Sequence, residues 1–111
     1  MAGPGTMKQT AGFADVFGGK LFNTIDYTGV ASYVNGTGEL LDPKGFGFPN
    51  TIESIVDISG DQSGAYYGIC FPVNSGVTKY YIRWFSVATG QEVTNATNLS
   101  GKTLKISAVG F

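Results

Sequence analysis

The hydrophobic pattern of this chain has a period of two, and it predicts strands rather than helices. Apolar and polar positions alternate imperfectly through Lys20–Tyr27, with Leu21 and Ile25 on one side, and they alternate through Lys102–Phe111. This period is typical of a half-buried β-strand. The run Thr51–Ser59 is predicted to alternate in the same way, with one face made by Ile52, Ser54, Val56 and Ile58. No stretch has the longer period of an amphipathic helix of normal length.

The most aromatic stretch, Gly64–Ser86, predicts an antiparallel hairpin at the centre of the fold. Its apolar runs, Tyr66–Phe71 and Lys79–Phe85, flank Asn74-Ser75-Gly76, which favours a chain reversal. Both faces of the second run are largely apolar. This strand is therefore either covered on both sides or leaves one face for another subunit. The aromatic residues of the hairpin are either core or a recognition surface: Tyr66, Tyr67, Tyr80, Tyr81 and Trp84.

Glycine-rich and proline-containing segments separate these runs and predict tight turns. Asn35-Gly36 is a strong turn signal, because both residues tolerate positive φ. A single helical turn is expected to begin at Asp42, with Pro43 in its first position. The whole pattern predicts an all-β fold, a small antiparallel sandwich or barrel of about six to eight short strands.

The chain is short enough to form one domain. Residues 1–12 contain three glycines, one proline and almost no large apolar side chain, so we expect a flexible N-terminal arm. Residues 13–111 are expected to form a single all-β domain. The start of the sequence lacks a basic segment followed by an apolar one, so no signal peptide is expected.

Composition narrows the classes of partner. Charged residues make up 14% of the chain, and the seven basic residues are scattered singly, so we expect no nucleic-acid partner. No apolar run approaches the length of a membrane span, and we expect no membrane partner. A surface with few charges is poorly protected against association, which favours a protein partly covered by a partner.

The candidate chemistry of the chain is sparse. The sequence has no histidine and one cysteine, Cys70, which removes Ser–His and Cys–His nucleophile pairs and a structural zinc site. Cys70 lies between Ile69 and Phe71 and is interpreted as a small buried hydrophobe. We therefore expect no catalytic residues, no cofactor and no metal, and a protein that is not an enzyme.

The order of segments from Gly18 onward resembles the small head-decoration, or capsid cement, proteins of tailed bacteriophages. The stretches that carry the resemblance are FGGKLFNTIDYTG, SYVNGTGELLDPKGFGF, TIESIVDI, AYYGICFPVNSGVTKYYIRWF and KTLKISAVGF. In that family the middle segment commonly has a tyrosine, a Gly-Gly-Glu-like turn, a leucine and a proline before a glycine-rich step. The residues in those places here are Tyr33, Gly38, Glu39, Leu41, Pro43 and Gly47.

The resemblance implies a virion structural protein that binds the outer surface of the capsid and cements neighbouring capsomers. It also implies the major capsid protein as partner, a homotrimer, synthesis in the host cytoplasm and a final place on the virion. We expect the partner contacts in the N-terminal arm and the glycine-rich loops, at Pro4, Met7, Phe13, Phe17, Tyr33, Phe46 and Phe48. Two alternatives remain: another phage part (tail tube, connector or fibre-associated domain) and a carbohydrate-binding module that uses Trp84 and tyrosines as a platform.

Overall fold

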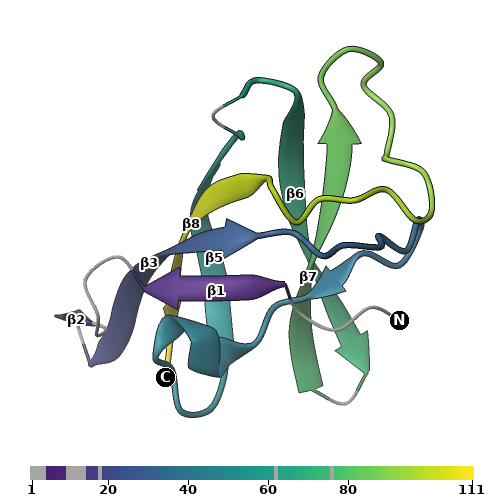
Figure 1. Cartoon of the computed structure of the whole chain (residues 1–111). Helices are drawn as coiled ribbons and strands as arrows, with labels where there is room; N and C mark the ends of the chain where they lie inside the picture. The colour runs from purple at the N-terminus through teal and green to yellow at the C-terminus, as the bar shows by residue number, and fades with distance from the viewer. Residues whose placement is uncertain (1–4, 10–14, 18, 62, 76) are drawn as a thin grey trace.

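The computed structural model describes residues 5–9, 15–17, 19–61, 63–75 and 77–111, which form an antiparallel β-sandwich of two sheets (Figure 1). Its elements are β1 (Thr6–Gln9), β2 (Asp15–Phe17), β3 (Lys20–Thr28), β4 (Glu39–Leu40), the 3₁₀ helix η1 (Pro43–Phe46), β5 (Ile52–Ser59), β6 (Tyr66–Ser75), β7 (Val77–Ser86) and β8 (Thr103–Gly110). The predicted all-β fold is confirmed, and of the two predicted architectures the chain adopts the sandwich.

The larger sheet has the order β1-β3-β8-β5, and β2 also pairs with β3. Strands β3 and β8 pair along their whole length, from Leu21 opposite Gly110 to Thr28 opposite Thr103. The alternation predicted for both strands is confirmed, because Ile25 on β3 and its partner on β8, Ile106, are both fully buried. On each of these strands, the side chains that alternate with the buried ones lie on the side of the sheet away from the core.

The smaller sheet has the order β4-β7-β6 and contains the predicted hairpin. Strands β6 and β7 pair without a register shift from Tyr66 opposite Ser86 to Ser75 opposite Val77. The long paired arms are the pair of neighbouring arrows labelled β6 and β7 in Figure 1. β7 is the central strand of this sheet, and β6 lies at its edge.

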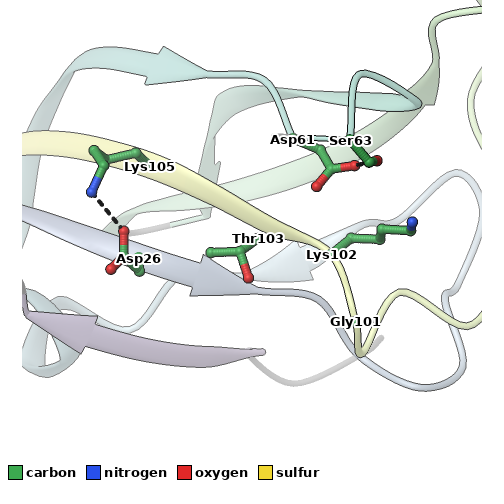
Figure 2. A pocket seen from close by; sticks show the side chains of 7 residues that line it. All are labelled: Asp26, Asp61, Ser63, Gly101, Lys102, Thr103 and Lys105. Carbon is green, nitrogen blue, oxygen red and sulfur yellow. Dashed lines mark hydrogen bonds and ion pairs between the residues drawn. The ribbon is translucent and has the colours of Figure 1, made fainter.

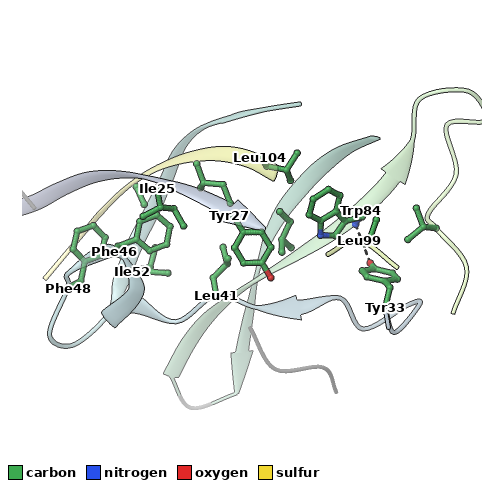
Figure 3. Close-up of a cluster of buried hydrophobic side chains, with 14 residues drawn as sticks. Ile25, Tyr27, Tyr33, Leu41, Phe46, Phe48, Ile52, Trp84, Leu99 and Leu104 are labelled. Carbon is green, nitrogen blue, oxygen red and sulfur yellow. Dashed lines mark hydrogen bonds between the residues drawn. The ribbon is translucent and has the colours of Figure 1, made fainter. Parts of the chain in front are cut away.

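A hydrophobic core fills the space between the two sheets and extends under the loops (Figure 3). Its largest fully buried side chains include Trp84 from β7 and Tyr27 from β3, whose ring centroids lie 6.4 Å apart. Full burial of one large apolar side chain contributes about 1.5–3 kcal/mol to folding. Loop residues complete this core at its ends: Tyr33, Leu41, Phe46, Phe48, Val93 and Leu99.

Strand β5 is confirmed where the sequence predicts it, but its predicted alternation is wrong. Two register shifts interrupt its pairing with β8, between Ile52 and Ser54 and between Ile55 and Asp57. Such bulges insert an extra residue and turn the following side chains to the other face. As a result Ile55 packs against the core, whereas the Val56 side chain is 57% exposed.

The predicted helical turn after the glycine-rich segment is present as η1. Asp42 is its N-cap, and the Asp42 carboxylate accepts a hydrogen bond from the Lys44 backbone N–H at 3.0 Å. Pro43 occupies the first turn, where its missing N–H costs no helical hydrogen bond. The turn places Phe46 in the core.

Part of the segment expected to form the N-terminal arm is a strand. Thr6–Gln9 form β1, which pairs with β3 from Thr6 opposite Thr28 to Gln9 opposite Ile25 (Figure 1). The Gly5 backbone N–H also donates a hydrogen bond of 2.8 Å to the Tyr27 hydroxyl. These contacts make residues 5–9 part of the larger sheet. The other residues of the expected arm, 1–4 and 10–12, lie outside the described part of the chain.

Candidate interaction face

Strands β6 and β7 divide their side chains between a core-facing row and an outward row. The core-facing row includes Trp84 opposite Gly68 and Ile82 opposite Cys70. The outward row, which we call the hairpin face, consists of four cross-strand pairs: Tyr67 with Phe85, Ile69 with Arg83, Phe71 with Tyr81, and Val73 with Lys79. The aromatic excess noted in the sequence is therefore shared between core and surface.

The hairpin face is apolar and partly open to solvent. The Ile69 side chain is 48% exposed and the Val73 side chain 39% exposed. Tyr67 and Phe85 stack across the two strands with ring centroids 5.5 Å apart. Cross-strand aromatic pairs of this kind stabilise a hairpin by roughly 0.2–1 kcal/mol each. The face thus combines a rigid aromatic surface with exposed aliphatic side chains.

Arg83 is the charged residue at the centre of this face. Its guanidinium carbon lies 4.2 Å from the centroid of the Phe71 ring, which is a cation–π contact. Arg83 Nε is buried and has no hydrogen-bond partner. Neither of the two ion pairs among the described residues involves Arg83.

A buried polar network lies on the core side of the same sheet. The Glu39 carboxylate, fully buried on β4, accepts hydrogen bonds from the Tyr27 hydroxyl at 2.6 Å and from Trp84 Nε1 at 3.1 Å. The Val30 backbone N–H donates a third, at 3.3 Å. Because the Tyr27 hydroxyl also accepts from the Gly5 N–H, the network joins β1, β3, β4 and β7.

Burial controls the protonation of this network. Removal from water raises the pKa of Glu39, and the hydrogen bonds from Tyr27, Trp84 and Val30 lower it by less. The pKa of Tyr27 is raised as well, mainly by burial and then by the Glu39 charge. On the same face of the sheet, burial raises the pKa of Cys70 to about 12. A thiol with this pKa stays protonated near neutral pH and is a poor nucleophile.

A polar pocket of about 410 Å³ lies beside the start of β8 (Figure 2). It is lined by acidic and basic side chains together, and Lys105 Nζ pairs with the Asp26 carboxylate at 2.8 Å. Ser63 donates a hydrogen bond to the Asp61 carboxylate, across the pocket from that pair (Figure 2). The mixed charges of this pocket select no single class of ligand.

A second hollow, of about 330 Å³, separates the edge strands of the two sheets. Its walls are mostly apolar, with Val56 and Ile58 from β5 and Ile69 from β6. The hollow joins the hairpin face at Ile69. The exposed apolar surface of the molecule therefore extends from the hairpin to the edge of the larger sheet.

The structure does not gather the residues expected to bind a partner into one surface. Tyr33, Phe46 and Phe48 are between 0% and 1% exposed, so they are core residues rather than a contact surface (Figure 3). Met7 packs partly buried against the core and η1. Pro4, Phe13 and the side chain of Phe17 lie outside the described part of the chain.

Sequence reasoning named Tyr67 and Tyr81 of the hairpin face as core or recognition surface, and missed Ile69, Phe71 and Phe85. The signal for them was the apolar character of both faces of the second hairpin strand. Trp84 is fully buried, so it does not form the exposed platform considered for a carbohydrate-binding module. The Tyr33 hydroxyl instead accepts a hydrogen bond from the Trp84 backbone N–H at 3.2 Å (Figure 3).

Comparison of the chain with protein-family models, with curated proteins and with solved structures finds no match. In the described part of the chain, no helix has the length and apolar character needed to cross a bilayer. The class that the structure defines is an antiparallel β-sandwich with a solvent-facing aromatic sheet face.

Proposed function

We propose that this protein is a non-enzymatic virion structural protein that binds the outer surface of a phage capsid and cements neighbouring capsomers. The observation that supports the proposal is the hairpin face, with Ile69 and Val73 exposed beside a stacked pair of aromatic rings. Contiguous exposed apolar surface on a small domain marks a site of interaction with another molecule. The resemblance of the segment order to capsid cement proteins supplies the kind of partner.

The sandwich suits a cementing role because its contact surface needs no rearrangement. The hairpin face is built on two fully paired strands, and its side chains are held by ring stacking across the strands. Rigid contact surfaces lose little conformational freedom when they bind. Assembly as a trimer, which we include in the proposal, multiplies such contacts, and the avidity of linked sites exceeds the affinity of each.

Co-sedimentation with emptied heads of the phage that encodes the chain tests this proposal. The wild-type protein is expected to pellet with the heads and to remain in solution without them. The double variant Ile69→Ser and Phe85→Ser should bind about tenfold or more weakly, a loss of about 1.4 kcal/mol or more. Phe111→Ser is a matched control, because the Phe111 side chain is 49% exposed and that of Ile69 48%.

Two results of this experiment would contradict different parts of the proposal. A wild-type protein that stays in solution with the heads contradicts the proposed function. Equal loss of binding in the Phe111→Ser control would show that general surface hydrophobicity, and not the hairpin face, carries the contact. Circular dichroism of each variant checks that the sandwich is intact before binding is compared.

A further inference from the structure

We propose that the hairpin face docks a protein segment that places an aspartate or glutamate carboxylate against Arg83. Apolar side chains of the same segment would lie on Ile69 and on the Tyr67–Phe85 pair. The inference rests on the proposed function and specifies the chemistry of its partner contact. It is carried by the position of one arginine within an apolar sheet face.

Arg83 is held in place before any partner arrives. Its guanidinium lies over the Phe71 ring, and its Cγ lies 3.0 Å from the position that a Cβ on Gly38 would take. A Cβ on Gly38 would also lie 2.5 Å from the Ile82 carbonyl oxygen, and φ at this position is +79°, so glycine at position 38 allows the close approach to β7 and to the arginine stem. An arginine packed between a strand and a ring loses little rotamer freedom on binding, so it is prepared to recognise a planar anion.

The hydrogen-bonding state of Arg83 points to a missing acceptor. A buried donor without a partner costs about 1–3 kcal/mol, and Arg83 Nε is such a donor in the described part of the chain. Carboxylates bind the planar guanidinium through two parallel hydrogen bonds, which are stronger than bonds between neutral groups. The Arg83 Nη groups are not among the buried unpartnered atoms, and through them a docked carboxylate would give this guanidinium an acceptor and a counter-charge.

The charges of the hairpin face are complementary to an acidic segment. The outward positions of β6 and β7 within residues 67–73 and 79–85 carry two cations, Lys79 and Arg83, and no carboxylate. Two lysines outside the hairpin face form ion pairs: Lys20 pairs with Glu53, and Lys105 pairs with Asp26 of the larger sheet. Glu92, which is bridged to Phe85 beyond these two strands, already accepts hydrogen bonds from the Tyr33 hydroxyl and the Gly36 N–H. A carboxylate approaching Arg83 therefore meets positive charge next to low-dielectric apolar surface.

The apolar neighbours of Arg83 favour a protein segment over a nucleic acid. Exposed Ile69 and Val73 gain from contact with aliphatic side chains, which a phosphate backbone lacks. Two cations neutralise few phosphates, and the whole chain has a net charge of -1. An extended segment with an acidic residue and, two positions before and after it, apolar residues presents both kinds of side chain on one face and matches the hairpin face in both respects.

Two synthetic heptapeptides test the inference directly: acetyl-Thr-Leu-Thr-Glu-Thr-Leu-Thr-amide, whose leucines and glutamate share one face of an extended chain, and the same peptide with glutamine in place of glutamate. Binding is followed by the NMR shift of the Arg83 Nε–H signal and of the hairpin amides, with peptide up to the millimolar range. The glutamate peptide should bind about tenfold or more tightly than the glutamine peptide, in line with a charge-assisted hydrogen bond. Arg83→Gln should abolish this difference.

The variants separate charge from fold. Arg83→Lys keeps the charge but not the planar fork, so it should retain only part of the preference for the glutamate peptide. Lys105→Gln removes the same charge from the larger sheet and should leave the preference unchanged. Equal binding of the two peptides, absence of binding by both, or an unchanged preference in Arg83→Gln overturns the inference. Tighter binding of a single-stranded oligothymidylate than of the glutamate peptide also overturns it.

The same variants keep this inference distinct from the proposed function. If wild-type protein and Arg83→Gln bind phage heads equally, the carboxylate contact is wrong and the cementing role stands. If wild-type protein ignores the heads yet prefers the glutamate peptide through Arg83, the cementing role is wrong and the recognition of an acidic segment stands.

Discussion

Glu39 is the residue on which the chemistry of the interior depends. Its carboxylate is fully buried, and its partners are two side-chain donors and a backbone N–H. No basic residue takes part in these hydrogen bonds, so only neutral donors offset the cost of burying the charged form of Glu39. This arrangement ties the stability of the sandwich to pH.

Replacing Glu39 by glutamine should change how stability depends on pH. Because burial raises the pKa of Glu39, the folded protein holds this proton more tightly than the unfolded chain. The resulting stability is fully present below the ordinary glutamate pKa and is lost as the pH rises through the raised pKa of the folded state. Glutamine does not titrate, and it keeps an acceptor for the Tyr27 hydroxyl and Trp84 Nε1.

Urea unfolding of both proteins between about pH 4 and about pH 8 measures this effect. The free energy of unfolding of Glu39→Gln should increase relative to that of wild type as the pH rises. Parallel pH profiles for the two proteins would show that Glu39 titrates alike in the folded and unfolded states, contrary to the prediction.

Gly29 is required by the close approach of a loop to the core. A Cβ at this position would lie 2.5 Å from Leu99 Cβ and 2.8 Å from the Leu99 carbonyl oxygen. Backbone atoms yield less easily than side-chain ends, so Gly29→Ala should destabilise the protein by about 2 kcal/mol or more. Gly101→Ala is the control, because a Cβ there meets nothing within 4 Å, and it should stay within about 0.5 kcal/mol of wild type.

Urea denaturation of the two alanine variants decides the point. A free energy of unfolding for Gly29→Ala close to that of the control would mean that the loop at Leu99 moves aside at little cost.

Among the elements, β1 makes part of the N-terminal segment a strand of the larger sheet. The segment was expected to be flexible because it has few large apolar residues. Met7 of this segment nevertheless packs against the core, and the Gly5 N–H bonds to Tyr27 of the buried network. Composition could not reveal these contacts, because they depend on residues far along the chain.

Deletion of residues 1–9 should therefore lower the stability of the sandwich. The loss of β1 exposes the edge of β3 and removes the burial of Met7, at a cost of roughly 2–3 kcal/mol. The measurement is the midpoint of urea unfolding, with Met7→Ala and Lys8→Ala as a matched pair within the strand. Met7→Ala should reproduce part of the loss, whereas Lys8, which is exposed, should be replaceable. A truncated chain as stable as wild type contradicts this role of β1.

The elements with a simple pattern were predictable, and those shaped by tertiary contacts were not. The aromatic hairpin follows from two aromatic-rich apolar runs around a turn, and the strand at Lys102–Phe111 follows from period-two alternation, which is kept in β8. The alternation of β5 does not survive, because two bulges against β8 redirect Ile55 and Val56. Bulges depend on the pairing of two distant strands, which no local pattern shows.

The residues of the candidate interaction face could be predicted only in part from the sequence, because burial also depends on tertiary contacts. Tyr33, Phe46 and Phe48 stand among glycines, and that setting suggested exposed loops. The structure shows that such loops fold back over the ends of the sandwich and bury their aromatic side chains. The hairpin face was indicated in the sequence by the apolar character of both faces of β7 and by the tyrosines Tyr67 and Tyr81.

At the scale of the whole molecule, the two sheets leave two free edges side by side. The described residues contain no strand paired to the outer edge of β5 or of β6, and the apolar hollow separates these edges. A pair of adjacent open edges is a place where further strands can add, and natural proteins usually protect such edges. In β6 the protection is partial, because Pro72 removes one donor from the row of outward-facing backbone groups.

Hydrogen exchange should report this architecture. The Val87 N–H bonds to the Ala65 carbonyl across the hairpin, and antiparallel pairing without a register shift then directs the N–H groups of Gly68 and Cys70 away from β7. These two amides should exchange much faster than those of Ile69 and Phe71, which face β7. Slow exchange of Gly68 and Cys70 in the free protein would contradict an open edge. Slow exchange only in the presence of phage heads would mean that the partner pairs with β6 in addition to contacting its side chains.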